Sequence, residues 1–329
     1  MTDQHGGLED QNQPRRAQIA TKYNVYILPE NKKVEANQGD TILDASLNAE
    51  IPHTHACGGN AKCTTCRITV LENADHLQRP SVKESRVLKK FGLEGQFRLA
   101  CQARIHGDVK IKREVLDVLD MKLFTPKSRE LFKSIQPLGE ERKAAILFAD
   151  IQDYTPFTDH FAPYDIMHLL NRYFYLAGNV IKKYEGRIID YYGDGFLAAF
   201  YLDETKVSMQ AVKSAFALFA MVDSLNDYLQ NLFHQNISIR VGIHTGDVIL
   251  GAIGIQGMDK LAVIGDTVNV ASRIEQMNKE TKTNLLLSET TYHEVAAKVT
   301  AGRTFQKRLK GKNGLYQLYE VKAVKDTES

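Results

Sequence analysis

The arrangement of four cysteines constrains this chain more than any other feature of its 329 residues. Three of them lie within Ala56–Cys66, ACGGNAKCTTC, with the spacing C-x5-C-x2-C, and the fourth follows in FRLACQARI. A disulfide framework rarely places three of four thiols in one turn-rich loop. A compact inorganic centre does require such a loop, because the loop can surround it while a distant thiolate closes the far side. Gly58 and Gly59 would let the backbone turn tightly and direct N–H groups toward sulfur.

The composition is that of a folded protein with room for two domains. The chain is 43% hydrophobic and 25% charged, and its formal net charge of +2 argues against a nucleic-acid binder that uses a global basic field. The apolar run Phe216–Val222 is too short to span a bilayer, and residues 1–21 form a polar tail without the apolar segment of a signal peptide. We therefore expect a cytoplasmic protein with no membrane or nucleic-acid partner, in a compartment where structural disulfides are rare.

The segments around the cysteines alternate between strand and helix patterns. Strands are expected at 23–30, 66–72 and 108–113, and a helix at 41–51. Residues 22–113 resemble a [2Fe–2S] ferredoxin of the β-grasp type, and the cysteine spacing is similar to that of the adrenodoxin and bacterial branch. The resemblance implies a [2Fe–2S] cluster and an electron donor or acceptor that the sequence does not identify. Its implied ligands are Cys57, Cys63, Cys66 and Cys101.

A structural zinc ion is the alternative for the same cysteines. It would use all four thiolates, or replace some of them with His53 or His55 from PHTHAC. Zinc sites more often pair two C-x-x-C hooks, and this chain has one. A Rieske centre would need histidines interleaved with the cysteines, a pattern that is absent. We therefore expect the two histidines to be surface loop residues.

The second half of the chain places two carboxylates at the ends of predicted strands. Residues 114–142 have helical spacing interrupted by prolines and predict a helical connector. The apolar run Ala144–Ala149 then predicts a buried strand that ends at Asp150, and YYGDGF predicts a hairpin with Asp194 at its tip. If the two carboxylates converge, they suit Mg²⁺ or Mn²⁺. The alternative is that Asp194 serves only the geometry of the turn.

A second pair of polar residues lies on a predicted helix. Asn269 and Arg273 in TVNVASR are four residues apart and would share one helical face. Asparagine can orient a sugar by hydrogen bonds, and arginine can stabilise charge on a phosphate. By themselves they could equally be a residue at a helix start and a surface cation. Strands and helices interleave over this half, which predicts an α+β sandwich of one sheet with covering helices.

Four motifs in order, FADIQDYT, YYGDGFLAAF, VGIHTGDVILGAIG and IGDTVNVASRI, make residues 143–325 similar to the catalytic domain of class III nucleotide cyclases. The resemblance implies a ferredoxin-like α/β fold, a head-to-tail homodimer with two shared sites, and conversion of a nucleoside triphosphate into a cyclic nucleotide and pyrophosphate. The implied roles are metal binding by Asp150, Asp194 and the Ile151 carbonyl, ribose orientation by Asn269, transition-state stabilisation by Arg273, and triphosphate binding by Lys310 or Lys312.

Two positions depart from the family pattern at the purine. Adenylate cyclases commonly have lysine where this chain has Asp190, and Asp or Thr where it has Ala262; guanylate cyclases usually have glutamate at the first position. We expect ATP as the substrate and a redox-regulated adenylate cyclase as the function, with a guanylate cyclase as the alternative. A further alternative, from another class, is a catalytically silent dimerisation domain that carries an electron-transfer ferredoxin.

Overall fold

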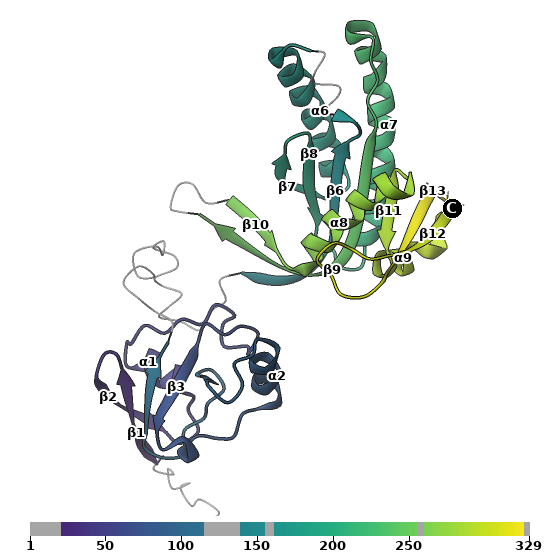
Figure 1. Ribbon diagram of the computed structural model, residues 1–329. Helices are drawn as coiled ribbons and strands as arrows, with labels where there is room; N and C mark the ends of the chain where they lie inside the picture. Colours follow the sequence, from purple (N-terminus) through teal and green to yellow (C-terminus); the bar gives the residue numbers. More distant parts are fainter. Residues whose placement is uncertain (1–20, 115–138, 155–160, 255–259, 326–329) are drawn as a thin grey trace, which may run out of the picture. The chain divides into compact units, whose positions relative to one another are not determined.

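The computed structural model describes residues 21–114, 139–154, 161–254 and 260–325. The chain divides into two compact units, residues 1–138 and 139–329, and each unit is described by itself (Figure 1). Most of the predicted connector, 114–142, and nearly all of the predicted tail, 1–21, lie outside the described residues. In the part of the chain that the structure describes, no helix combines the length and the apolar character needed to cross a membrane.

The first unit is built on a five-stranded mixed sheet with the order β2-β1-β5-β3-β4. Strand β1 is antiparallel to β2 and parallel to β5, so the first and last strands of the unit lie side by side at its centre. Ile27 of β1, Ile68 of β3 and Ile111 of β5 are fully buried in one core with Ile42 of α1. The elements are β1 Lys22–Leu28, β2 Lys32–Asn37, α1 Ile42–Asn48, β3 Arg67–Glu72, the 3₁₀ turn η1 Ala74–His76, α2 Val82–Lys90, β4 Arg98–Leu99 and β5 Val109–Arg113.

Local side-chain bonds determine where the helices of this unit begin. Thr41 caps α1 in a capping box with Asp44, and Ser81 caps α2 by accepting a hydrogen bond from the Glu84 backbone N–H. The predicted helix 41–51 is confirmed but ends earlier, since Glu50 adopts a left-handed φ of 55° that turns the chain. The strands predicted at 23–30, 66–72 and 108–113 are confirmed as β1, β3 and β5, whereas β2, α2 and β4 were not predicted.

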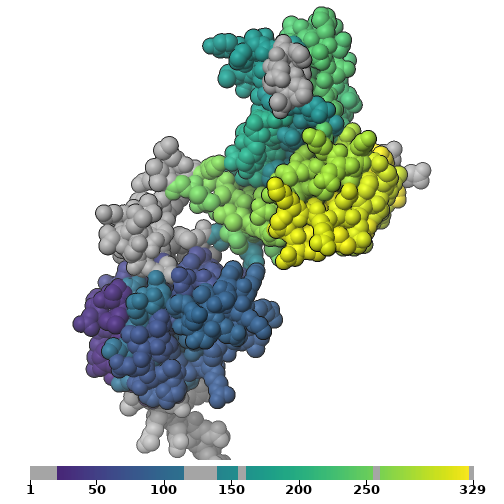
Figure 2. All heavy atoms as spheres, viewed as in Figure 1, coloured from purple at the N-terminus to yellow at the C-terminus, as the bar shows by residue number. Residues whose placement is uncertain are grey.

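The second unit contains an eight-stranded sheet within the described residues, with the order β12-β13-β11-β9-β6-β8-β7 and β10 paired to β9 outside this path. The hairpin of β9 and β10 projects from the body of the unit (Figures 1 and 2). The strands are β6 Glu140–Ile151, β7 Arg187–Tyr192, β8 Gly195–Phe200, β9 Ile239–Ile253, β10 Lys260–Ile264, β11 Leu285–Ser288, β12 Val299–Lys307 and β13 Tyr316–Val324. The helices are α6 Pro163–Lys183, α7 Val207–Phe233, α8 Asp266–Thr281 and α9 Glu289–Val295, followed by η2 Ala296–Lys298.

The central strand β6 supplies a core on both faces of this sheet. Its residues Ala145 and Leu147 pack on the face covered by α6, α7 and α9, while Ala144 and Ile146 pack on the face covered by α8. Burial on both faces explains the continuous apolar run in the sequence. Strand β6 begins at Glu140, three residues before the start predicted for the second domain, and pairs with β9 along its whole length. The α+β class expected from the sequence is confirmed.

Candidate functional site

The four cysteines lie together although 44 positions separate the first from the last. Cys57 and Cys63 are in the loop between α1 and β3, Cys66 directly precedes β3, and Cys101 follows β4. The Sγ atoms of Cys66 and Cys101 are 3.6 Å apart. Two thiolates bound to one tetrahedral metal at about 2.3 Å would be about 3.8 Å apart, so this pair is spaced to hold one metal ion.

Cys57 and Cys63 form the second pair. A hydrogen bond from Cys63 lowers the pKa of Cys57 to about 5, while the same contact raises the pKa of Cys63. In the other pair, Cys66 lowers the pKa of Cys101, and Cys101 with burial raises that of Cys66. Among the described residues no three His, Cys, Asp or Glu side chains converge on a single ion. Two pairs of thiols fit the two irons of a [2Fe–2S] cluster better than the four ligands of one zinc ion.

The loop also directs backbone N–H groups toward the sulfurs, as the glycines predicted. Gly58 and Gly59 have φ angles of 63° and 78°, in the left-handed region that glycine adopts readily. Backbone hydrogen bonds from this loop lower the pKa values of Cys57 and Cys101 after larger contributions from their partner thiols. The donors are the backbone N–H groups of Asn60, Ala61, Lys62 and Cys63.

The prediction that His53 and His55 are surface residues is wrong. Their exposed fractions are 1% and 3%. The chain folds back over α1 at Ile51, and the Nδ1 atom of His53 lies 3.1 Å from Ser46 Oγ. Burial, followed by the charge of His55, lowers the pKa of His53 to about 4, so this ring is neutral at pH 7. Both histidines are therefore interior residues next to the cysteine loop, and the His55 carbonyl oxygen accepts a hydrogen bond from the Gly58 N–H of that loop.

The two predicted metal-binding carboxylates meet at one end of the sheet. Asp150 is the penultimate residue of β6 and Asp194 lies in the turn between β7 and β8, where β6 pairs with β8. Their side chains interact; burial, followed by the Asp150 charge, raises the pKa of Asp194 to about 6, and burial also raises that of Asp150. The Oδ2 atom of Asp194 is buried and has no hydrogen-bond partner among the described residues. A buried, unpaired oxygen beside a second carboxylate fits a divalent cation such as Mg²⁺.

The turn itself does not require Asp194. The left-handed residue is Gly193, with φ of 63°, so glycine supplies the turn geometry. Gly195, the first residue of β8, must be glycine because β6 passes close to it. A Cβ atom there would lie 2.8 Å from Asp150 Oδ1 and 2.7 Å from the Ala149 carbonyl oxygen. The turn-geometry alternative is therefore weakened. Ile151, whose carbonyl was predicted as a ligand, is the last residue of β6 and is buried beside this pair.

Asp150 shares a cavity of about 390 Å³ with residues of α8. Asn269 and Glu275 line it from the helix, and Phe148 and Tyr192 line it from the sheet. Arg273 is half-buried and donates from Nη1 to Gln276 Oε1 at 3.0 Å, and Gln276 also lines the cavity. The structure thus brings Asp150, one of the acid pair Asp150 and Asp194, and the Asn269 face of α8 to one concave surface, whose described lining includes neither Asp194 nor Arg273.

The two predicted triphosphate lysines lie elsewhere. Lys310 is exposed in the loop between β12 and β13, and Lys312 contacts Asp266 at the start of α8. The described lining of the cavity includes neither lysine. Glu275 was missed by sequence reasoning: it is 8% exposed, and burial, then the charge of Asp150, raises its pKa to about 7. Its place two residues beyond Arg273 was the only signal in the sequence.

A lysine that the sequence did not single out lies against Asp190. Lys260, the first residue of β10, donates from Nζ to Asp190 Oδ2 at 2.7 Å, and Asp190 Oδ1 accepts from the Tyr191 N–H at 3.1 Å. These bonds lower the pKa of Asp190, the Lys260 bond most. The side chain of Tyr192, which lines the cavity, also bonds to Asp190. Ala262 follows on β10 and pairs with Gly251.

Comparison with known proteins matches a different domain family to each of the two units. The model of the adenylate and guanylate cyclase catalytic domain matches residues 138–321, and that of the 2Fe-2S iron-sulfur cluster binding domain matches residues 25–106. An adenylate cyclase of Anabaena cylindrica is 34% identical over 193 residues, which cover 55% of this chain and 37% of that protein. A 2Fe-2S ferredoxin of Escherichia coli is 45% identical over 80 residues, 24% of this chain and 72% of that protein.

Solved structures resemble the second unit. The guanylyl cyclase Cya2 aligns with a TM-score of 0.54 and 26% identity, covering 58% of this chain and 96% of that one. The adenylyl cyclase CyaB from P. aeruginosa, at 24% identity and a TM-score of 0.52, shares the fold over 57% of this chain and 97% of that one. The chain spans about a third of the length of the first curated cyclases that it matches. Because the cyclase match covers more than half of the sequence and contains the acid pair and Asn269, this chain belongs to the class III adenylate and guanylate cyclase family and carries a 2Fe-2S ferredoxin domain before its cyclase domain.

Proposed function

We propose that this protein is a cytoplasmic, redox-regulated adenylate cyclase that converts ATP into 3′,5′-cyclic AMP and pyrophosphate. The observation that carries the proposal is the acid pair: Asp194, whose buried Oδ2 has no partner among the described residues, interacts with Asp150, and Asp150 lines a cavity of about 390 Å³. Two carboxylates with raised pKa values in a cleft are typical of a functional site. The [2Fe–2S] module would exchange one electron with a partner that the structure does not identify.

Each site residue has a defined task in this reaction. Asp150, Asp194 and the Ile151 carbonyl would hold two Mg²⁺ or Mn²⁺ ions, which when bound lower the pKa of the ribose 3′-hydroxyl and neutralise phosphate charge. Asn269 would orient the ribose, and Arg273 would stabilise the charge that develops when the 3′-oxygen bonds to the α-phosphorus and the bond to pyrophosphate breaks. Lys310 or Lys312 would bind the triphosphate.

We infer that the functional site is shared between two copies in a head-to-tail homodimer. The projecting hairpin of β9 and β10 supports this inference, because it exposes apolar side chains that a monomer leaves in water. Ile249 and Ile264 are cross-strand partners with exposed fractions of 40% and 53%, and Ile253 is 50% exposed. A second copy would cover this face.

The pair of Lys260 and Asp190 supports ATP as the substrate. Asp190 Oδ1 is already bonded to the backbone, so Oδ2 and Lys260 Nζ would present one acceptor beside one donor. Adenine offers the complement, the N6–H donor beside the N1 acceptor, whereas guanine adds a second N–H donor. The curated relatives named adenylate cyclase agree with this choice, while the likeness to the guanylyl cyclase Cya2 keeps GTP as the second candidate.

Removing the Lys260 side chain should reduce the preference of the enzyme for ATP over GTP. We expect Lys260→Ala to lower kcat/KM for ATP about tenfold, because a hydrogen bond from a charged donor to the base is lost, and to change kcat/KM for GTP less. The measurement is steady-state kinetics with both nucleotides. Lys213→Ala, at an exposed lysine on α7, is the matched control. Equal losses for ATP and GTP would show that Lys260 does not read the base.

The product identifies the reaction directly. Purified protein is incubated with ATP or GTP and Mn²⁺, and the products are identified by liquid chromatography and mass spectrometry. Cyclic AMP formed by the wild type and lost in Asp150→Asn is the expected result. If neither nucleotide is cyclised although Mn²⁺ binds, the silent dimerisation domain is the better description.

The cyclase rate should depend on pH through Asp194. Because its pKa is raised to about 6, protonation below that pH removes a metal ligand, and we expect the rate to fall about tenfold per pH unit at subsaturating Mn²⁺. Higher Mn²⁺ concentrations should move the fall to lower pH, since metal and proton compete. A profile that does not respond to Mn²⁺ would contradict this origin.

The same pKa has a consequence for stability without metal. Folded Asp194 binds its proton more tightly than unfolded Asp, so the metal-free protein gains stability as pH falls through 6 toward 4 and loses it as pH rises. Asp194→Asn should therefore raise Tm at pH 7.5 in the presence of a chelator and abolish this part of the pH dependence. An unchanged Tm would show that burial and the charge of Asp150 do not destabilise ionised Asp194 in the folded protein.

The ferredoxin module should bind an iron–sulfur cluster. We expect the protein to purify brown, with about two irons and two inorganic sulfides per chain, and Cys63→Ser to lose the colour. Thr64→Ser, in the same loop, is the matched control and should retain it. Stoichiometric zinc without sulfide would instead favour the zinc site.

A further inference from the structure

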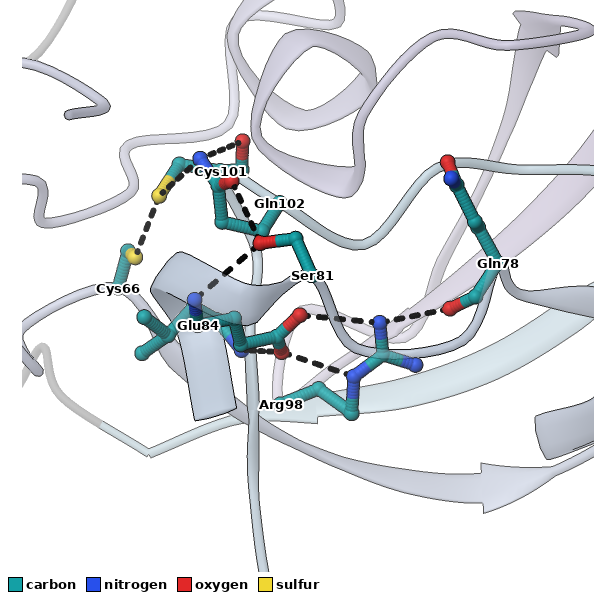
Figure 3. A network of polar contacts seen from close by, with 8 residues as sticks. Cys66, Gln78, Ser81, Glu84, Arg98, Cys101 and Gln102 are labelled. Carbon is teal, nitrogen blue, oxygen red and sulfur yellow. Dashed lines mark hydrogen bonds and ion pairs between the residues drawn. The ribbon is translucent and has the colours of Figure 1, made fainter. Parts of the chain in front are cut away.

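Gln102, the residue after the last cysteine, places its side-chain amide against that cysteine's sulfur. Its Nε2 atom lies 3.6 Å from Cys101 Sγ and 3.0 Å from the Cys101 carbonyl oxygen (Figure 3). The same atom lies 3.4 Å from the Gly59 carbonyl oxygen. Gly59 belongs to the loop that carries the other thiols. One amide therefore joins the fourth cysteine to the cysteine loop.

The orientation of this amide follows from its partners. The three groups around Nε2 are all acceptors, whereas Oε1 accepts a hydrogen bond from Ser81 Oγ at 3.2 Å. A flipped amide would place its oxygen against two carbonyl oxygens and a sulfur, and would leave the Ser81 hydroxyl facing an N–H₂ group. The N–H donors thus face the sulfur because two carbonyl oxygens lie on the same side, and the hydrogen bond from Ser81 to Oε1 adds to this preference.

A buried ion pair holds Ser81 in place. Glu84, with no exposed side-chain surface, accepts from Arg98 Nε at 2.8 Å and from Arg98 Nη2 at 3.2 Å, and also from the Leu99 backbone N–H at 2.8 Å. These bonds attach the first turn of α2 to β4, two residues before Cys101 (Figure 3). Since Ser81 caps α2, its hydroxyl has a fixed position relative to the Cys101 sulfur.

We propose that Gln102 raises the reduction potential of the cluster by donating an N–H to the Cys101 thiolate, and that Ser81 holds it in the donating orientation. An added electron makes the cluster sulfurs more negative, so an N–H···S bond stabilises the reduced state more than the oxidised state. Gln102 is a positioning and tuning residue and is not a ligand. The proposal goes beyond the cyclase activity and depends only on the cluster, so it can be tested even if no cyclic nucleotide forms.

The test is a potentiometric titration of the full-length, cluster-loaded protein followed by visible absorbance and electron paramagnetic resonance. Gln102→Leu keeps the approximate shape of the side chain and removes the donor, so we expect the one-electron reduction equilibrium to shift about tenfold toward the oxidised form, a fall of about 59 mV. Gln78→Leu is the matched control, because Gln78 meets the network only through its backbone carbonyl. Equal potentials for wild type, Gln78→Leu and Gln102→Leu would overturn the proposal.

A second pair of variants tests the role of Ser81. These variants also test the proposal if Gln102→Leu fails to assemble a cluster. Ser81→Thr keeps the hydroxyl and the helix cap and should leave the potential unchanged. Ser81→Ala frees the amide, so the potential should fall in the same direction but less than in Gln102→Leu. Iron and sulfide contents equal to wild type show that the cluster is intact. An unchanged potential in Ser81→Ala would show that Ser81 does not orient the donor.

Discussion

Mixing two inactive variants of this protein is expected to restore cyclase activity. Asp150 and Arg273 should act in one site but come from different subunits, so Asp150→Ala and Arg273→Ala should each lower kcat about 100-fold or more. In a heterodimer, one site would combine both defects and the other would be intact. With random exchange, half of the dimers are mixed and each has one working site, so recovery should approach about a quarter of wild-type activity.

The control for this experiment is a mixture whose defects fall in the same half of the site. Asp150→Ala with Asp194→Ala should remain inactive at every ratio, because neither subunit then supplies an intact acid pair. Subunit exchange is verified by mass spectrometry of differently tagged chains. An inactive mixture of Asp150→Ala and Arg273→Ala, despite proven exchange, would argue that each site belongs to a single chain.

Reduction of the cluster is expected to change the cyclase rate about 5- to 150-fold, the range that corresponds to typical coupling energies of 1–3 kcal/mol between sites. One chain joins a ferredoxin domain, which we propose accepts an electron, to a cyclase domain whose site we infer to be shared between subunits. Added charge changes the hydrogen bonds to the cluster sulfurs and hence the packing of the cysteine loop. Transmitted through residues 114–142, a small displacement would separate the acid pair from Asn269 and Arg273.

Anaerobic assays of dithionite-reduced and air-oxidised protein at equal ATP and metal concentrations measure this coupling. The Cys63→Ser variant is the control, because it should lack the cluster and give one rate under both conditions. A rate change that persists in Cys63→Ser would be an effect of the reductant itself. Equal rates in the wild type, with reduction confirmed by spectroscopy, would leave the ferredoxin module without a regulatory role.

Much of the architecture was predictable because it depends on local sequence patterns. The period of the apolar residues predicted β1, α1, β3 and β5, and the spacing of three cysteines predicted a loop around a metal–sulfur centre. The run Ala144–Ala149 predicted a strand buried on both faces, and the glycines around Asp194 predicted the hairpin that presents it. Short motifs carry such information because turns and strand ends require particular residue types.

Other features of the site depended on partners that are distant in the sequence. Lys260 meets Asp190 across 70 positions, and Glu84 meets Arg98 between a helix and a strand that were not predicted. His53 was expected in a surface loop because its spacing to the cysteines fits no Rieske centre, yet the return of the chain over α1 buries it.

The sequence by itself therefore determined the two families, the four thiols and the two carboxylates that we propose bind metal. Only the tertiary structure decided which thiols form pairs, that Asp150 and Asn269 line one cavity, and that the Gln102 amide faces sulfur. The physical reason is that burial and hydrogen-bond geometry, which shift pKa values and orient donors, are properties of the folded surroundings and not of a residue's neighbours along the chain.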